Sequence, residues 1–143
     1  DAETHAVHPA FAGPWFDYIT HPDIAAALKK GHWANYVQGA VLRARREVQQ
    51  QPFRPLVGMV GSDLPRGAAL SSSHAVCTVA LLAALGWNNV DLDKDQSILA
   101  VRDAEWYTGA RTGTSDQGAM ILGRRMNSTR YSGRCERSIS PRA

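Results

Sequence analysis

The sequence is poor in cysteine, with only Cys77 and Cys135 among its 143 residues. Two cysteines cannot build the bridge framework of a small secreted domain, and neither belongs to a pair with zinc-binding spacing. Cys77 lies in an apolar run and is expected to be a small core residue. No apolar run approaches the roughly 20 residues of a membrane span, and the N-terminus lacks a basic region followed by an apolar one. We therefore expect a cytoplasmic protein without a membrane partner.

Excess positive charge is confined to one end of the chain. The net charge is +3, and residues 124–143 hold six arginines against one acidic residue, Glu136. Scattered arginines in one tail are weak evidence for nucleic-acid binding, so no nucleic-acid partner is expected. The apolar period is also lost there, which predicts that residues 125–143 are a disordered basic tail. The preceding residues, 1–124, have the composition and length of one globular domain.

Helical periodicity dominates the middle of the chain. A short helix is expected from Pro22 to Lys30, and longer ones over residues 33–50, 72–85 and 95–109, the last capped by Asp95. The helix at 72–85 has apolar residues around much of its surface, which predicts a central position. The helix at 33–50 carries one apolar stripe, formed by Trp33, Tyr36, Val37, Ala40, Val41, Ala44 and Val48.

Strand signals are few. Leu56–Val60 is a short apolar run between prolines, and it predicts a buried strand. Residues 1–20 carry several aromatic side chains without a clear period, so they are expected to form either a strand or an irregular segment packed on the core.

A loop of small residues, Leu64–Ala75, leads directly into the helix expected at 72–85. Its serines can cap the first turn of that helix. Backbone N–H groups and the positive end of a helix dipole also make such a place an anion site, with phosphate the natural ligand. From the local chemistry alone, an ordinary capped helix and a phosphate site are both open.

Two acidic residues have similarly divided interpretations. Asp116 follows Thr114 and Ser115, either of which can cap a helix, and an acid in the first turn favours the helix dipole. It is therefore either a dipole-stabilising residue or a carboxylate held at the mouth of a glycine-rich site. Glu105 ends a partly apolar helix face, and its own pattern favours an ordinary solvated helix acid.

Three stretches resemble motifs of the GHMP small-molecule kinases, in the same order and with compatible spacing. Pro65–Ala75 resembles their phosphate-binding loop, although Ala69 stands where the motif has its second glycine and His74 where it has alanine. The segment 33–39 (WANYVQG) resembles the Trp-x-Asn-Tyr-Val-x-Gly helix start of the galactokinase branch. Residues 113–117 (GTSDQ) are similar to its Gly-x-x-Asp-Gln segment. The loop is not a Walker P-loop, since no Gly-Lys-Ser/Thr follows its glycines.

The resemblance implies a fold, a reaction and a set of ligands. The implied fold is α/β, the two-layer N-terminal domain of GHMP kinases, in which helices cover one face of a mixed sheet. Residues 1–124 are expected to form part of this domain, with only part of the sheet. The reaction is ATP-dependent phosphorylation of a monosaccharide at its anomeric hydroxyl, as in galactokinase, with Mg²⁺ as the metal.

The resemblance also implies site residues. Asp116 would be the catalytic carboxylate and, with Gly113, would contact the sugar. Ser73 and Glu105 would hold Mg²⁺, although Glu105 lies one residue closer to Asp116 than in galactokinases. Nucleotide binding would fall to Trp33, near the adenine, and to the loop residues Pro65, Gly67, Ala68, Ala69, Leu70, Ser71, Ser72 and Ser73.

Other parts of the family pattern are not found in the 143 residues. Neither the early segment that supplies a catalytic arginine and sugar-binding acids nor the late glycine-rich motif is present. We therefore expect a central piece of a sugar kinase with little activity alone. A non-catalytic nucleotide- or sugar-binding module, or sensor, is the alternative, and a fold without any ligand is the third. His74 is expected to be a surface or packing residue.

Overall fold

All regular elements in the described part of the chain are helical. The computed structural model describes residues 5–48, 51–64 and 71–123. A 3-10 helix, η1 (Pro9–Ala12), and two short helices, α2 (Trp15–Ile19) and α3 (Pro22–Ala27), precede four longer helices. These are α4 (Ala34–Glu47), α5 (Ser72–Trp87), α6 (Lys94–Trp106) and α7 (Ser115–Leu122). Within these ranges no helix has the length and apolar character needed to cross a bilayer.

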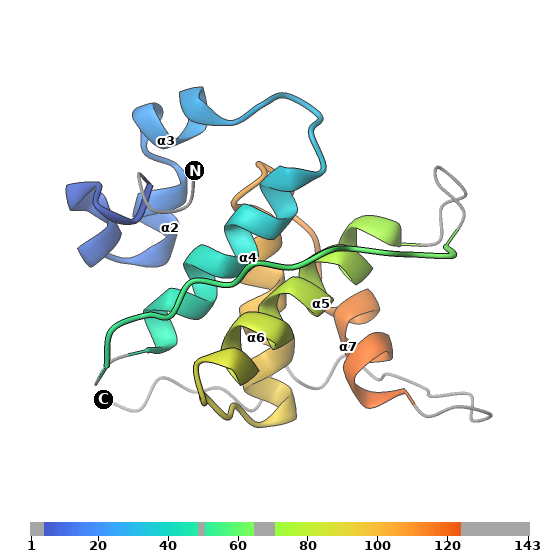
Figure 1. Cartoon of the computed structure of the whole chain (residues 1–143). Coiled ribbons are helices and arrows are strands. Elements are labelled where there is room, and N and C mark those ends of the chain that lie inside the picture. The colour runs from blue at the N-terminus through green and yellow to red at the C-terminus, as the bar shows by residue number, and fades with distance from the viewer. Residues whose placement is uncertain (1–4, 49–50, 65–70, 124–143) are drawn as a thin grey trace.

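Helix α4 lies between two separate apolar clusters, and Figure 1 shows it passing between the N-terminal helices and α5. Ala40 and Ala44 face α5 and α6 in the main cluster, while Leu42 packs with the N-terminal helices. Val37 and Val41 of the predicted stripe are only partly buried. The helix was expected to bury one face, but it buries two because a second group of helices covers its other side.

Small residues allow α4, α5 and α6 to pack closely. The main cluster contains Ala40, Ala44, Cys77, Leu81, Ala84, Leu85, Ala100, Val101 and Ala104. Gly39 marks the tightest contact, since a Cβ there would lie 2.4 Å from the carbonyl oxygen of Ala104 and 2.9 Å from Cβ of Tyr107. Helix α5 contacts α4, α6 and α7, as its predicted central position requires. Its apolar surface is not wholly buried, however, because Val79 and Leu82 are exposed.

The N-terminal segment is attached to this helical core by specific polar contacts. Trp15 donates from Nε1 to the carbonyl oxygen of Asp103 at 2.8 Å. The buried Tyr107 hydroxyl lies 2.6 Å from Nδ1 of His5, whose carbonyl oxygen accepts a hydrogen bond from Tyr18. Burial raises the pKa of Tyr18 to about 12 and lowers that of His5. Residues 5–20 are thus helical and packed on the core, so the strand expected there as one alternative is wrong.

The mixed sheet expected from the family resemblance is absent from the described residues, so that prediction is wrong. Leu56–Val60, the predicted buried strand, runs extended across α4 and α5 in Figure 1. Val57 is 97% exposed and Met59 is 96% exposed, so the segment is not in a core. A strand exists only when a second strand accepts and donates its backbone hydrogen bonds, and none of the described segments does so.

One buried side chain holds the beginning of this extended segment. Asn88, fully buried after α5, accepts from the backbone N–H of Arg54 at 2.7 Å and donates to the Arg54 carbonyl oxygen at 3.2 Å. Gln51 adds a hydrogen bond to the carbonyl oxygen of Asn88. The side-chain amide of Asn88 therefore makes the two backbone hydrogen bonds that a neighbouring strand would make, but only for Arg54.

Helix ends lie within three residues of their predicted positions, and α4 and α6 each end three residues early, at Glu47 and Trp106. Helix α6 is capped by Asp93 rather than Asp95, since Asp93 and Gln96 form a reciprocal capping box. Helix α3 ends at Ala27, three residues before the expected Lys30. His21 and Pro22 begin α3 as expected, with the His21 side chain accepting from the backbone of Asp23.

The close approach of α4 and α6 at Gly39 generates a stability prediction. Gly39→Ala should lower the free energy of unfolding by about 1–3 kcal/mol or more, because its methyl group overlaps rigid backbone. Gly86→Ala is the matched control, since a Cβ at this α5 position meets nothing within 4 Å. It should leave stability unchanged or raise it by up to ~1 kcal/mol through helix propensity. Urea unfolding followed by circular dichroism measures both, and equal effects would contradict the packing described here.

Candidate functional site

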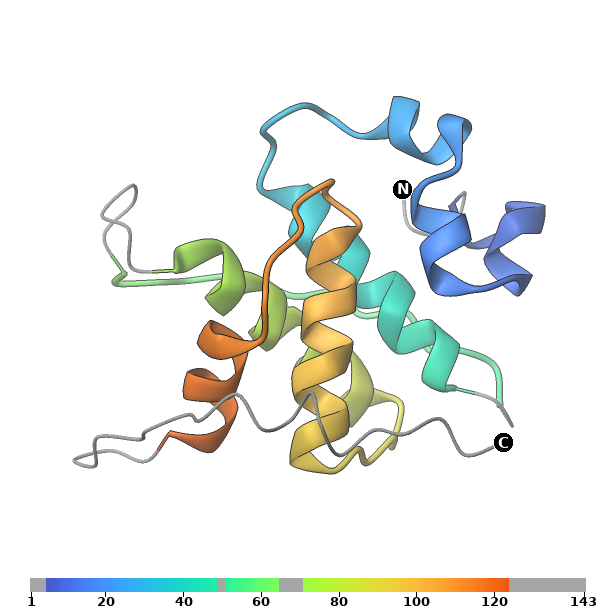
Figure 2. The ribbon, with the colours of Figure 1, turned by 180° about the vertical axis from the view of Figure 1, so that it is seen from behind.

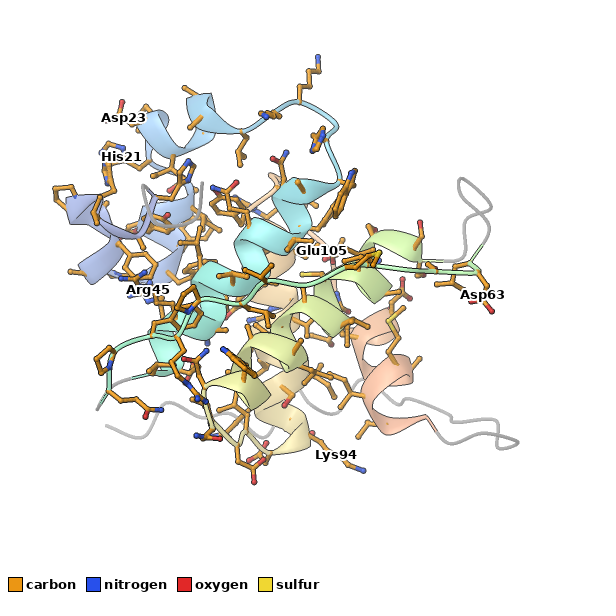
Figure 3. All side chains as sticks on the ribbon, in the orientation of Figure 1. His21, Asp23, Arg45, Asp63, Lys94 and Glu105 are labelled. Carbon is orange, nitrogen blue, oxygen red and sulfur yellow. The ribbon has the colours of Figure 1, made fainter. Side chains whose placement is uncertain are left out.

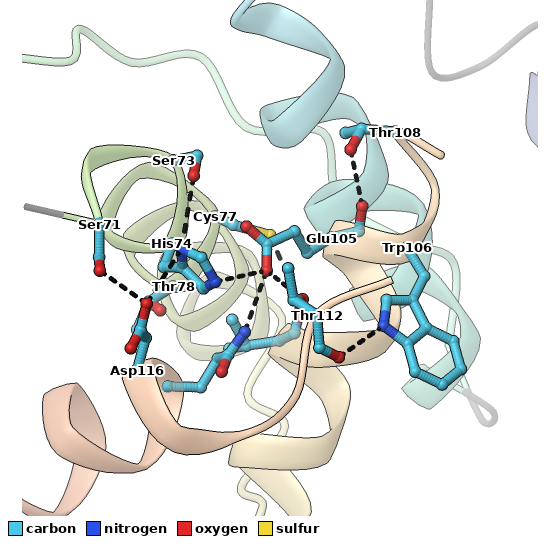
Figure 4. Close-up of polar contacts among 12 residues, drawn as sticks. Ser71, Ser73, His74, Cys77, Thr78, Glu105, Trp106, Thr108, Thr112 and Asp116 are labelled. Atoms are coloured by element: carbon cyan, nitrogen blue, oxygen red, sulfur yellow. Dashed lines mark hydrogen bonds and ion pairs between the residues drawn. The ribbon is translucent and has the colours of Figure 1, made fainter. Parts of the chain in front are cut away.

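Two carboxylates, a histidine and a serine meet where the N-terminal ends of α5 and α7 approach the C-terminal end of α6 (Figure 4). Ser71 precedes α5 in the left-handed conformation, with φ at 52°. Its hydroxyl does not cap its own helix but donates to Oδ2 of Asp116 at 2.6 Å. The end of the serine loop is therefore joined directly to the first turn of α7.

Glu105, on the last turn of α6, is the most deeply buried acidic group of the cluster, with 1% of its surface exposed. Its Oε2 accepts from the Thr112 hydroxyl at 2.7 Å and from Nε2 of Gln117 at 3.0 Å. The interpretation of Glu105 as a solvated helix acid is therefore wrong. A buried carboxylate is costly unless it is hydrogen-bonded and paired, and the loop after α6 supplies one of the donors.

That loop turns back over Glu105 because of its local geometry. Gly109, three residues after the end of α6, has φ at +88°, a conformation that favours glycine. Trp106 then donates from its indole nitrogen to the carbonyl oxygen of Thr112 at 3.0 Å. These two features place the hydroxyl of Thr112 within reach of Glu105.

His74 lies between the two carboxylates. Its Nε2 is 3.0 Å from Oε2 of Glu105, and its Nδ1 is 3.6 Å from Oδ2 of Asp116 and 3.4 Å from the Ser73 hydroxyl. Only a protonated imidazole can donate from both nitrogens at once. His74 was expected to be a surface or packing residue, but its side chain is only 15% exposed and contacts the carboxylate of Glu105, with which it forms an ion pair when the ring is protonated.

Cys77 lies one turn further along α5 and is inert by its surroundings. Burial, together with the nearby charge of Glu105, raises the pKa of its thiol to about 12. Its Sγ lies 3.8 Å from the Val101 carbonyl oxygen. Since thiolates rather than thiols are nucleophiles, Cys77 belongs to the core, as its sequence context predicts.

The structure brings together some of the predicted site residues. Ser71, Ser73, Glu105 and Asp116 meet in the cluster, and Ser72 lies in the same turn of α5 as Ser73. Gly113 is exposed between Thr112 and the start of α7. Trp33 is 56% exposed just before α4 and stacks on His32. The remaining predicted nucleotide-binding residues lie outside the described ones, namely Pro65, Gly67, Ala68, Ala69 and Leu70.

Sequence patterns did not identify three members of the cluster. His74 appeared only as a departure from the motif, Gln117 only as the residue after Asp116, and Thr112 not at all. Gln117 is fully buried, and its Oε1 has no donor within the described ranges. Thr112 follows Glu105 by seven residues across a loop, a separation that no helix or strand period marks.

Mg²⁺ is the metal that the resemblance implies for Ser73 and Glu105. Mg²⁺ takes oxygen ligands in a near-octahedral arrangement, and Glu105 and Ser73 carry suitable oxygens. Oε2 of Glu105, however, already accepts from Thr112 and Gln117 and faces His74, whose ring also contacts Ser73. In this arrangement the pair does not fit the ion, so the metal-binding function of Ser73 and Glu105 stays a prediction and no step is assigned to it.

Comparison with known proteins now places the cluster in a family. Residues 35–124 match the model of the GHMP kinases N terminal domain. This range contains every described member of the cluster and more than half of the chain. The chain therefore belongs to the GHMP kinase family.

Curated relatives are galactokinases. The Candida maltosa enzyme is 34% identical over 95 residues, which is 64% of this chain and 44% of that protein. The Dictyostelium discoideum enzyme is 32% identical over 101 residues, covering 70% of this chain and 20% of the enzyme. The Pyrococcus furiosus enzyme is 34% identical over 101 residues, covering 69% of this chain and 28% of the enzyme. The chain thus spans less than half the length of these relatives, and no solved structure matches it.

The burial of Glu105 predicts a large stability effect. Glu105→Ala should lower the free energy of unfolding by about 3 kcal/mol, because Thr112, Gln117 and His74 lose a shared partner in a buried place. Asp63→Ala is the control, since Asp63 is exposed on the extended segment, far from Glu105 in Figure 3. It should change stability by less than about 0.5 kcal/mol. Similar losses in chemical denaturation of the two variants would show that Glu105 is not held as described.

The raised pKa of Cys77 predicts the pH dependence of its reactivity. In a Cys135→Ser background, the native thiol should resist alkylation between pH 8 and 10, while unfolded protein reacts quickly. The folded thiol keeps its proton up to about pH 12, whereas the unfolded thiol loses it near pH 9.0. The contribution of Cys77 to the free energy of unfolding therefore falls as the pH rises from about 9 to about 12. Alkylation is followed by mass spectrometry. Equally fast labelling of native and unfolded protein at pH 9 would contradict the prediction.

Proposed function

We propose that the chain is the phosphate- and acceptor-binding part of a galactokinase-type sugar kinase, which transfers the γ-phosphoryl group of ATP to the anomeric hydroxyl of a monosaccharide. The observation that supports this proposal most is the Ser71–Asp116 hydrogen bond, which joins two motifs separated by 45 residues. Their meeting puts a carboxylate beside the end of the small-residue loop. Phosphoryl transfer needs both an anion-binding element and an acceptor-orienting group.

Helix α5 would supply the first requirement. Its N-terminal turn has backbone N–H groups without partners in the helix, and the dipole of this 16-residue helix favours negative charge there. Ser72 and Ser73 lie in that turn, so their backbone groups and hydroxyls would contact the nucleotide phosphates. The predicted contacts of the preceding loop residues with the phosphates belong to the same proposal.

Asp116 would supply the second requirement. Its side chain is 41% exposed, in contrast to the buried Glu105, so a substrate hydroxyl can reach its carboxylate. The hydrogen bond from Ser71 and the nearby imidazole of His74 restrict its orientation. The sugar oxygen would attack the γ-phosphorus while the bond between that phosphorus and the bridging oxygen of ADP breaks. Asp116 would accept the proton of the sugar hydroxyl. Gly113, two residues before α7, would border the sugar, and Trp33 would lie near the adenine.

A second function, non-catalytic binding of a nucleotide or sugar, is favoured by one feature of the cluster. Both carboxylates already have partners in this chain, since Asp116 accepts from Ser71 and Glu105 pairs with His74. The chain also spans only 44% of its Candida maltosa relative. We therefore propose that these 143 residues bind ligands with little turnover, and that the kinase activity belongs to a longer protein in the cytoplasm. The domain limits at 1–124 and 125–143 stay predictions.

The proposal is tested by calorimetric titration of the 143-residue chain with ATP and Mg²⁺. Ser73→Ala should weaken nucleotide binding about tenfold, which corresponds to about 1.4 kcal/mol, because it removes a hydroxyl from the phosphate-binding turn. Asp116→Ala should leave nucleotide affinity nearly intact, since this carboxylate faces the acceptor. Ser115→Ala is the serine control, an exposed residue at the start of α7 that should have no effect.

Two results would contradict this function. Absence of nucleotide binding by the wild-type chain would leave the cluster as a structural arrangement only. Equal weakening by Ser73→Ala and Asp116→Ala would mean that the two residues act through folding rather than on separate ligands. Circular dichroism of each variant verifies that it is folded.

A further inference from the structure

A second group of potential ligand residues lies in the N-terminal segment, outside the family match. His8, His21 and Asp23 each offer a side-chain atom within 4.8 Å of the other two. Nε2 of His8 is 3.6 Å from Oδ2 of Asp23, and Nδ1 of His21 is 3.8 Å from the same oxygen. In Figure 3, His21 and Asp23 lie beside each other on the N-terminal helices, well separated from Glu105.

Local sequence holds these side chains in place. His8 and His21 each precede a proline and occupy the N-cap of a helical turn, η1 and α3 respectively. Nδ1 of His8 accepts a hydrogen bond from the backbone N–H of Ala10 at 3.2 Å, and Nδ1 of His21 accepts one from the backbone N–H of Asp23 at 3.3 Å. The two imidazole rings also meet edge to face, with their centroids 4.6 Å apart. Backbone contacts therefore position the two imidazoles next to each other, while the carboxylate of Asp23 beside them is exposed.

We propose that His8, His21 and Asp23 form a site for a divalent transition-metal ion of the zinc class. The ligand atoms would be Nε2 of His8, Nδ1 of His21 and Oδ2 of Asp23, with water as the fourth ligand. Tetrahedral Zn²⁺ with bonds of about 2.0–2.1 Å places its ligand atoms roughly 3.3–3.5 Å apart. The distances of 3.6 and 3.8 Å to the carboxylate oxygen therefore require a contraction of a few tenths of an ångström. The two imidazole nitrogens lie within 4.8 Å of each other and have to approach by up to about 1.5 Å. Two imidazole nitrogens favour zinc, nickel or copper over Mg²⁺ and Ca²⁺.

Metal binding competes with the two histidine caps. Ligation through Nε2 moves the proton of His8 to Nδ1, which then faces the Ala10 N–H and cannot accept from it. His21 would bind the metal through the lone pair that now receives the Asp23 N–H. Each cap is a single long hydrogen bond, whereas the ion makes three bonds at once and joins η1 to α3. Binding should therefore loosen the first turn of η1 while fixing its position against α3.

This site does not rest on the proposed kinase function, and its occupant would strengthen the N-terminal segment as a unit. The ion would tie residue 8 to residues 21–23, while Trp15 and Tyr18 between them anchor the segment to α6 and to His5. A ligand that binds the folded state alone stabilises it by RT ln(1 + [L]/Kd), where [L] is the free ligand concentration. Zn²⁺ should accordingly raise the melting temperature of the chain.

The test uses the Cys135→Ser chain, because this substitution removes one competing thiol. The chain is titrated with Zn²⁺ by calorimetry and with Co²⁺ by visible absorption. His8→Ala and His21→Ala should each weaken Zn²⁺ binding at least tenfold and abolish the intense tetrahedral Co²⁺ bands. His32→Ala is the matched control. His32 also accepts a backbone N–H before a helix, from Ala34 at 3.2 Å, but is not in the cluster. It should bind Zn²⁺ like the parent.

Asp23→Asn protects the test against a folding artefact, because it keeps the backbone N–H that His21 accepts and changes only the carboxylate. It should fold like the parent by circular dichroism, bind Zn²⁺ at least tenfold more weakly and lose the metal-dependent rise in melting temperature. The site is refuted if the parent shows no Zn²⁺ binding, or if His8→Ala, His21→Ala and Asp23→Asn bind as tightly as His32→Ala.

Discussion

The arrangement of α5, α6 and α7 depends on one buried carboxylate. Glu105 is almost completely enclosed, and each of its partners comes from a different element: His74 from α5, Thr112 from the loop after α6 and Gln117 from α7. Removing a carboxylate from water is unfavourable unless such donors surround it. The three donors therefore have to be assembled together, which fixes α7 against α5 and brings Asp116 next to Ser71. Figure 2 shows from behind how α7 lies beside α6.

The same carboxylate sets a conflict between architecture and family chemistry. In the resemblance to GHMP kinases, Glu105 and Ser73 are expected to hold a metal, while here His74 faces both of them. The motif that this loop resembles has alanine at the position of His74, so here a larger side chain fills the space between the predicted ligands. The consequence is a cluster in which one imidazole faces two carboxylates, with the exposed Asp116 left as the carboxylate that a ligand can reach.

Local patterns predicted what depends on local interactions. The periodicity of residues 33–50 identified α4, and the serine, aspartate and tryptophan motifs identified the family. Three features that depend on distant contacts were missed. The burial of Glu105 arises from Thr112 and Gln117 across a loop, the pairing of His74 needs α6, and the second buried face of α4 needs the N-terminal helices. The strand at Leu56–Val60 failed for the same reason, since an apolar run of five residues predicts a strand only if a partner lies alongside.

We propose that the cluster around Ser71, His74, Glu105 and Asp116 is the ligand site of this kinase domain. The most direct test is a titration of the ¹⁵N-labelled chain with ATP and Mg²⁺, followed by backbone NMR. Chemical-shift changes are predicted to concentrate at residue 33 and in residues 65–78 and 105–117, while the amides of η1 and α3 remain unchanged. Changes confined to other parts of the chain, or no changes at saturating ATP, would show that this cluster is not the ligand site.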